Sequence, residues 1–231
     1  MSFVTKLRSA TPDVMAPDGS GDIVTRGLVS EVLVSANGDV IFALTHNYSG
    51  YPMIRQAKAM VKAGELGDIR VVQGEYPQDW LTTALEKTGQ KQAAWRTDPK
   101  RSGAGGCVGD IGTHTFQLLC DVSGLSCEEL SADLTSFVKG RVLDDNAHVM
   151  LRFKGGAKGM LWASQVAPGN ENGLRIRIYG TKGGLEWTQA DPNYLWYTPF
   201  GEPKRLITRG GAGSGPAAGR FNTSARSDAR L

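Results

Sequence analysis

The chain has 231 residues, of which 40% are hydrophobic and 21% charged, and its formal net charge is +3. It contains no run of 18 apolar residues, which excludes a membrane-spanning helix, and its first residues lack the apolar segment of a secretory signal. The three cysteines are odd in number and match no zinc-binding spacing, so we expect a reduced, cytoplasmic protein without a metal site.

The positive charge is concentrated at the C-terminal end of the chain. Residues 204–231 contain six Lys or Arg and one acidic residue, whereas the rest of the chain has 20 basic and 22 acidic residues. No aromatic residues accompany the basic ones as in a nucleic-acid platform, so we expect no nucleic-acid partner. Residues 209–231 are rich in Gly, Ala, Ser and Arg, which predicts a disordered tail.

Residues 1–44 hold few signals of regular structure. Residues 28–34 are apolar and include β-branched side chains, and the turn signal Asn37-Gly38 separates them from a second apolar run. This pattern predicts a short hairpin, or a strand after a loop. The fragment at residues 19–21 lacks the third glycine and the preceding strand of a dinucleotide fingerprint. We therefore expect a short N-terminal remnant and no complete dinucleotide-binding fold.

The middle of the chain contains two predicted helices. Apolar residues recur at helical spacing after residue 52, with basic residues on the other side. The predicted elements are a helix from Pro52 to Gly64 or Gly67, a strand at 69–76, an irregular loop with a short helix at 81–104, and a helix from about Asp110 to Ser123, ended by Gly124.

Beyond residue 124 the pattern consists of strands and turns. Candidate strands lie near residues 129–138, 145–153, 158–166, 174–180, 184–188, 194–198 and 204–207. Their short connections favour antiparallel pairing. We therefore predict an α+β domain over residues 45–208, with a large, mostly antiparallel sheet and helices packed on one face. The open face would serve for oligomerisation with a second copy.

A glycine-rich segment leads into the second predicted helix, which carries Asp110 and His114. At 3.6 residues per turn, their four-residue spacing places both side chains on one helix face. A carboxylate beside an imidazole can orient the ring and support its charged form, which general acid–base chemistry needs. The glycines would let a ligand approach the backbone closely. The alternative is an aspartate that stabilises the helix N-terminus and a histidine that only packs.

Polar and aromatic residues follow two predicted strands. His46 and Asn47 come after a strand ending at Leu44, where ligand crevices often lie, although a plain loop capped by Asn47 fits equally well. The second cluster consists of Tyr76, Gln78, Asp79 and Trp80. This mixture suits a sugar or polyol, but it also suits an ordinary sheet edge.

Four further residues could have a functional or a structural role. Trp95 and Arg96 could stack on and hydrogen bond to an anion or a nicotinamide, or they could be a packed tryptophan and a solvated arginine. His148 lies in an alternating strand and is expected on a sheet face. Cys107 lies in the glycine-rich segment with only His114 as a base nearby, which disfavours a nucleophilic role.

These residues resemble the Gfo/Idh/MocA family of oxidoreductases over about residues 41–207. The segment at residues 45–53 resembles the family's junction between cofactor and substrate domains, and residues 63–72 resemble its helix-to-strand entry. The catalytic stretch of the family is similar to Trp95-Arg96, then Gly105-Gly106, then Asp110-Ile111-Gly112-Thr113-His114. The last motif is the most specific of these in its order and spacing.

The resemblance implies a two-domain enzyme that moves a hydride between NAD or NADP and a sugar, polyol or related alcohol. It implies that His114 takes the hydroxyl proton and that Asp110 assists or binds the substrate. The site residues expected are Asn47, Tyr76, Asp79 and Trp80 at the substrate, and His46, Trp95 and Arg96 at the cofactor.

The chain departs from the family pattern at both ends. Only about 40 residues precede the junction, and the family's Glu-Lys-Pro motif has no counterpart. We therefore expect a truncated dehydrogenase that is weakly active or inactive alone, unless a separate nucleotide-binding chain supplies the missing domain. The alternative is a non-catalytic module that binds a small molecule or forms oligomers.

Overall fold

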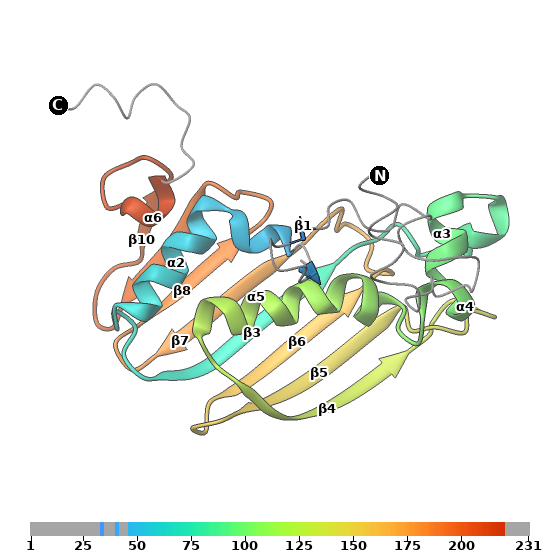
Figure 1. The fold of residues 1–231 in the computed structure, drawn as a ribbon, viewed down its shortest axis with the longest axis horizontal. Coiled ribbons are helices and arrows are strands. Elements are labelled where there is room, and N and C mark those ends of the chain that lie inside the picture. The colour runs from blue at the N-terminus through green and yellow to red at the C-terminus, as the bar shows by residue number, and fades with distance from the viewer. Residues whose placement is uncertain (1–32, 35–39, 42–45, 220–231) are drawn as a thin grey trace.

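The computed structural model describes residues 33–34, 40–41 and 46–219, and the structural statements below concern these residues. Its centre is an eight-stranded sheet with helices packed on one face (Figure 1). The strands are β3 (Ile69–Pro77), β4 (Cys127–Thr135), β5 (Asn146–Phe153), β6 (Lys158–Ser164), β7 (Arg175–Gly180), β8 (Gly183–Thr188), β9 (Tyr194–Pro199) and β10 (Arg205–Thr208).

The helices are short and lie mostly before the main run of strands. They are η1 (Asn47–Gly50), α2 (Pro52–Lys62), η2 (Leu85–Thr88), α3 (Lys91–Arg96), α4 (Pro99–Ser102), η3 (Val108–Gly112), α5 (Thr113–Ser123) and α6 (Pro216–Gly219). The strands β1 (Leu33–Val34) and β2 (Val40–Ile41) pair with each other antiparallel. The rest of the N-terminal unit predicted for residues 1–44 lies outside the described residues.

The sheet order is β10-β9-β8-β7-β3-β6-β5-β4. Only β3 and β6 run parallel, and the other neighbouring pairs are antiparallel. The prediction of an α+β fold with a large, mostly antiparallel sheet is therefore confirmed. Because β3 and β6 are parallel, their C-terminal ends meet at the same edge of the sheet, where loops can gather polar side chains.

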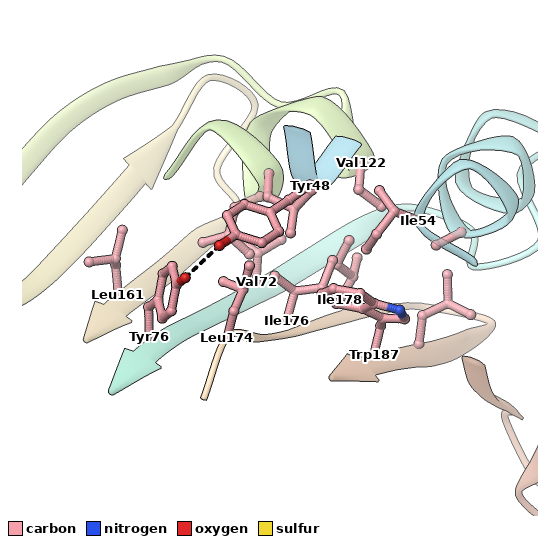
Figure 2. Packing of buried hydrophobic residues seen from close by; sticks show 14 of the residues in the cluster. Tyr48, Ile54, Val72, Tyr76, Val122, Leu161, Leu174, Ile176, Ile178 and Trp187 are labelled. Carbon is pink, nitrogen blue, oxygen red and sulfur yellow. Dashed lines mark hydrogen bonds between the residues drawn. The ribbon is translucent and has the colours of Figure 1, made fainter. Parts of the chain in front are cut away.

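The core lies between the sheet and the helices α2 and α5. From Ala147 onward strand β5 alternates, so that Val149, Leu151 and Phe153 are buried while the residues between them are exposed. Figure 2 shows the same packing under the two helices, with Ile54 and Val122 among the labelled side chains. Burying a side chain of this size contributes about 1.5–3 kcal/mol, so this layer supplies much of the stability.

The opposite face of the sheet has no helix on it in the described part of the chain (Figure 1). Its exposed large hydrophobic residues include Val71, Met150, Met160, Tyr179 and Trp196. Ion pairs lie among them, such as Arg177 with Glu75 at 3.1 Å. The predicted oligomerisation through this face stays a prediction.

The segment after β10 differs from the expected disordered tail. Residues 209–219 are described, and the backbone N–H of Gly215 donates to Oε1 of Gln56 on α2 at 2.8 Å. Ala218 is 1% exposed. The small side chains that suggested disorder instead allow the backbone to pack closely on α2, and residues 220–231 lie outside the described part. No described helix has the length and apolarity needed to cross a membrane.

Candidate functional site

A cleft of about 530 Å³ opens where β3 ends. Tyr76 lies near the end of β3, and Gln78 and Trp80 follow it. The cleft is lined by Tyr48, Tyr76, Gln78, Trp80, Gln90, Gln92, Arg96, Asp110, Ile111, His114, Glu171 and Asn172. The structure thus brings together Tyr76, Gln78 and Trp80 of the second cluster with residues of the Asp110–His114 segment, whereas His46 and Asn47 do not line this cleft.

A second cleft of about 340 Å³ adjoins the first. Its lining consists of His46, Trp95, Arg96, Ser102, Gly105, Gly106, Gly109, Asp110, Thr113 and His114. Arg96, Asp110 and His114 line both clefts. Two ligands bound in these spaces would therefore meet at the same three side chains.

The helix that carries Asp110 and His114 is wound differently from the predicted one. Residues Val108–Gly112 form a π-helix, and the α-helix begins only at Thr113. An added Cβ at Gly112 would lie 3.1 Å from Cγ2 of Val108, so the glycine leaves room for that side chain one turn earlier. The predicted helix therefore exists but starts earlier, and the α-helical geometry assumed for the pair does not hold across its first turn.

Asp110 is held by two donors from other parts of the chain. Its Oδ2 accepts from Nε of Arg96 at 3.0 Å and from Nε2 of Gln165, which follows β6, at 2.8 Å. No hydrogen bond joins Asp110 to His114 in the described structure. Asp110 therefore acts on the imidazole through its charge rather than by orienting the ring, which corrects the expected pairing.

His114 is surrounded by aromatic rings. Its ring packs edge to face against Tyr48 and His46, with centroids 5.1 Å and 5.8 Å away. Its Nδ1 is buried and has no hydrogen-bond partner among the described residues. Burial lowers the pKa of His114, the charge of His46 lowers it further, and Asp110 opposes both only in part. The neutral imidazole, the form that accepts a proton, is therefore favoured.

An NMR titration of the three imidazoles is expected to place the midpoint of His114 below about 6.5, the ordinary value for histidine. The unfolded chain then binds more protons than the folded chain between the two pKa values, so His114 reduces stability as pH falls through that window. Asp110→Asn should lower the midpoint further, since the carboxylate raises the pKa. A midpoint at or above 6.5 would contradict this assignment.

Two tyrosine hydroxyls meet in the floor of the first cleft. The hydroxyl oxygens of Tyr48 and Tyr76 are 2.5 Å apart, and both rings are buried (Figure 2). Burial raises the pKa of Tyr76, and its hydrogen bond to Tyr48 raises it further. Tyr76 therefore keeps its proton at neutral pH and presents a hydroxyl rather than a phenolate.

Arg96 is engaged by several neighbours. Its guanidinium carbon lies 4.2 Å from the ring centre of Trp95 and 5.8 Å from that of Trp80. Its Nη1 donates to Oε1 of Gln92 at 2.5 Å. The arginine is thus not a solvated side chain but a fixed wall shared by the two clefts, and Trp95 stacks on it.

The glycine-rich segment is pinned by Asp144, which precedes β5. The carboxylate accepts from the backbone N–H groups of Gly106 at 2.7 Å and Val108 at 2.8 Å, and from the thiol of Cys107 at 3.1 Å. A Cβ at Gly106 would lie 2.0 Å from the carbonyl oxygen of Asp144. Gly106 therefore serves close packing within the protein. It also lines the second cleft, and its expected role in admitting a ligand stays a prediction.

Cys107 is buried in surroundings that disfavour a nucleophilic role. Burial raises the pKa of its thiol, and the neighbouring Asp144 raises it further, so the reactive thiolate is disfavoured. All three cysteines are free thiols. The expectation against a nucleophilic role thus agrees with the surroundings of Cys107.

Substituting two glycines of this segment by alanine should have different effects on stability. Gly106→Ala is expected to lower the free energy of unfolding by roughly 1–3 kcal/mol or more, because the new methyl overlaps the Asp144 backbone. Gly109→Ala has open space around its Cβ and should leave thermal stability unchanged or slightly raised. Thermal and urea unfolding of both variants tests this, and equal stabilities would refute the packing role of Gly106.

Two predicted site residues are not among those that line the clefts. Asn47 is exposed at the start of η1. Asp79 is half-buried, and its carbonyl oxygen accepts from the hydroxyl of Thr82 at 2.6 Å. His148 lies exposed on the open sheet face and stacks in parallel on Trp162, as expected for a sheet-face histidine.

Sequence reasoning missed several cleft residues. Gln90, Gln92, Glu171 and Asn172 line the first cleft but lie in loops or at a short helix, where no periodic pattern identifies them. The only local signal near Asn172 is the preceding turn at residues 168–169. No group of three or more His, Cys, Asp or Glu able to hold a metal occurs in the described structure.

Comparisons with known proteins bear on the whole described domain. The sequence profile described as "GFO/IDH/MocA C-terminal domain" matches residues 54–186. An uncharacterized oxidoreductase of Bacillus subtilis, YfiI, is 37% identical over 184 residues, which are 78% of this chain and 46% of the relative. The chain therefore spans less than half of that relative's length.

Solved structures show the same fold. An oxidoreductase from Sinorhizobium meliloti is 60% identical with a TM-score of 0.67, covering 79% of this chain and 47% of that one. An inositol dehydrogenase homolog from Azotobacter vinelandii, complexed with NAD⁺, is 36% identical with a TM-score of 0.71, covering 75% and 45%. A structure of an inositol dehydrogenase homolog from the same organism, complexed with NADH and myo-inositol, is 34% identical with a TM-score of 0.67. The match covers 75% of this chain and 44% of that one.

Proposed function

The chain belongs to the Gfo/Idh/MocA family. We propose that it acts as an oxidoreductase, which moves a hydride between NAD or NADP and a sugar, polyol or related alcohol. The observation that carries this proposal is the pair of clefts meeting at Arg96, Asp110 and His114. Hydride transfer requires an alcohol carbon and a nicotinamide ring to be adjacent, with a base beside the hydroxyl. The two adjoining clefts, which share His114, support this proposal.

The second cleft fits the nicotinamide end of the cofactor. Trp95 and Arg96 line it, Gly109 leaves open space beside it, and Nδ1 of His46 is buried without a hydrogen-bond partner in the described structure. We propose that these residues hold the nicotinamide. The described residues contain no strand–glycine loop–helix unit for the diphosphate. When bound, the dinucleotide supplies the hydride acceptor.

We propose that His114 removes the proton of the substrate hydroxyl as the hydride leaves. Its neutral form is favoured by burial, so it is ready to accept that proton. Asp110 is fixed through Oδ2, which leaves Oδ1 available to accept a hydrogen bond from a neighbouring substrate hydroxyl. Tyr76 and Trp80 complete the alcohol side of the cleft.

The test is hydride transfer by the full chain. The chain is mixed with NAD⁺ or NADP⁺ and a panel of sugars and cyclic polyols, and reduced nicotinamide is followed by absorbance. Reduction with at least one substrate, depending on the chain, is the expected result. Failure with every substrate and both dinucleotides would overturn the proposal that this chain is catalytic.

A second candidate is a non-catalytic module that binds a small polyol or forms oligomers. The observation that favours it is the lack of a dinucleotide-binding unit in the described residues. Titrating NADH and NADPH by fluorescence separates the candidates: saturable binding supports the enzyme, and no binding supports the module.

We further propose a cytoplasmic location and a homo-oligomer formed through the open sheet face. Analytical ultracentrifugation of wild type and Trp196→Lys would test the oligomer.

A further inference from the structure

A chain of side-chain hydrogen bonds runs along one wall of the first cleft. Nε1 of Trp80 donates to Oε1 of Gln78 at 3.0 Å, and Nε2 of Gln78 donates to Oδ1 of Asn172 at 2.8 Å. Nδ2 of Asn172 then donates to Oε1 of Gln189 at 2.8 Å. Trp80, Gln78 and Asn172 all line the cleft.

Trp80 fixes the direction of the whole chain. An indole N–H can only donate, so the Gln78 atom that it faces must be the oxygen. The Gln78 amide nitrogen must then face Asn172, which therefore presents its oxygen to Gln78 and its nitrogen to Gln189. Neither amide can flip without losing a hydrogen bond, so the donors and acceptors of this wall have fixed positions.

The wall leaves both donors and acceptors free for a ligand. Gln78 uses one of its two amide hydrogens within the chain, and each amide oxygen accepts one hydrogen bond there, which leaves a second lone pair. A substrate hydroxyl both donates and accepts, so a row of hydroxyls is complementary to such a mixed wall. A carboxylate or a phosphate accepts only and cannot satisfy the free amide oxygens.

The charges of the cleft also favour an uncharged ligand. Its one lining cation, Arg96, is already paired with Asp110 and bonded to Gln92. Glu171 lies beside Asn172 on the wall, is exposed, and has no ion pair in the described structure. The lining therefore carries one uncompensated negative charge, which repels anionic ligands.

We propose that Trp80, Gln78 and Asn172 form the specificity-determining wall of the cleft, and that this wall together with Glu171 selects uncharged polyhydroxy compounds over carboxylated or phosphorylated ones. This inference rests on the proposed function only in taking the cleft as the substrate site. It assigns hydroxyl recognition to the oriented amides and the exclusion of anions to Glu171.

The experiment is equilibrium binding to the full chain without nucleotide. Myo-inositol and D-glucuronate are titrated by calorimetry or ligand-observed NMR at low ionic strength. Wild type is expected to bind myo-inositol at least about tenfold more tightly than glucuronate. Glu171→Lys should close most of that gap, whereas Glu128→Lys, the same charge change on exposed β4, should not.

The oriented amides are tested by a second pair of variants. Trp80→Phe should weaken myo-inositol binding by roughly three- to tenfold, because Gln78 is no longer fixed. Asn172→Leu, at an exposed position that tolerates substitution, should weaken it similarly, and Trp196→Phe on the open face should have no effect. Circular dichroism confirms that each variant is folded.

The outcomes separate this inference from the proposed function. Unchanged myo-inositol affinity in both wall variants, an unchanged preference in Glu171→Lys, or no polyol binding by wild type would overturn the inference. The expected binding pattern in a chain that transfers no hydride would support the inference while the proposed catalysis fails. Hydride transfer with wall variants that leave the substrate preference unchanged would support the function and refute the inference.

Discussion

Replacing His114 with alanine is expected to lower the turnover of hydride transfer by roughly 10²- to 10⁴-fold, the usual contribution of a general base. The imidazole lines both clefts, its neutral form is favoured by burial, and the only other imidazole among the described residues that line either cleft is His46. The affinity for NADH should change little, because the proton acceptor does not need to hold the dinucleotide.

The matched control for this substitution is His148→Ala. His148 lies on the open face of the sheet, stacked on Trp162 and away from both clefts, so its loss should leave turnover unchanged. Steady-state kinetics and fluorescence titration of both variants check the prediction. Turnover in His114→Ala within threefold of wild type would refute the assignment of this residue as the base, whatever its effect on binding.

Replacing Arg141 with methionine is expected to lower the free energy of unfolding by about 3–5 kcal/mol, the cost of removing one partner from a buried ion pair. The side chains of Arg141 and Asp145 are each 1% exposed, and Nη1 of Arg141 is 3.0 Å from Oδ2 of Asp145. The guanidinium also donates to the carbonyl oxygens of Leu81 and Thr83 and pairs with Glu86 at 2.9 Å. Its removal would leave the carbonyl oxygen of Leu81 and the carboxylate of Glu86 without this donor. Asp145 would lose its buried countercharge and keep only the backbone N–H groups of Phe137 and Val138.

The same substitution should also loosen the cleft. Arg141 ties the loop after β3 to the segment before β5, and that loop continues into α3, which carries Gln92 and Arg96. Urea unfolding measures the stability, and polyol binding measures the cleft. The control is Arg152→Met. The side chains of Arg152 and of its partner Glu129 are 65% and 63% exposed, so this ion pair contributes at most about 1 kcal/mol. Equal losses in both variants would contradict the prediction.

The sheet could be predicted from the sequence because its signal is local. Residues 147–153 alternate in sequence and are buried on every second position in the structure, so the strand needs no distant information to be recognised. The helix after Pro52 is identified by its periodicity and its starting proline in the same way. The ends of these elements agree with the prediction to within a few residues.

The candidate site could be predicted only in part because its geometry depends on distant contacts. The motif at residues 110–114 identified Asp110 and His114, but the partners of Asp110 lie at positions 96 and 165. Nothing near Gly106 indicates that a carbonyl from residue 144 fills the space beside it. The polar wall is built from loop residues with no repeat, so only the fold reveals that they face one another.

The hold of Asp144 on residues 106–108 has a thermodynamic consequence for ligand recognition. Three donors of the segment converge on the carboxylate of Asp144, just before β5, so we expect the turn preceding His114 to be rigid before any ligand arrives. The loss of chain entropy is incurred during folding rather than on association. Ligand binding to this domain should therefore resemble lock-and-key docking, with the backbone amides of 106–108 slow to exchange in hydrogen–deuterium experiments even in the free protein.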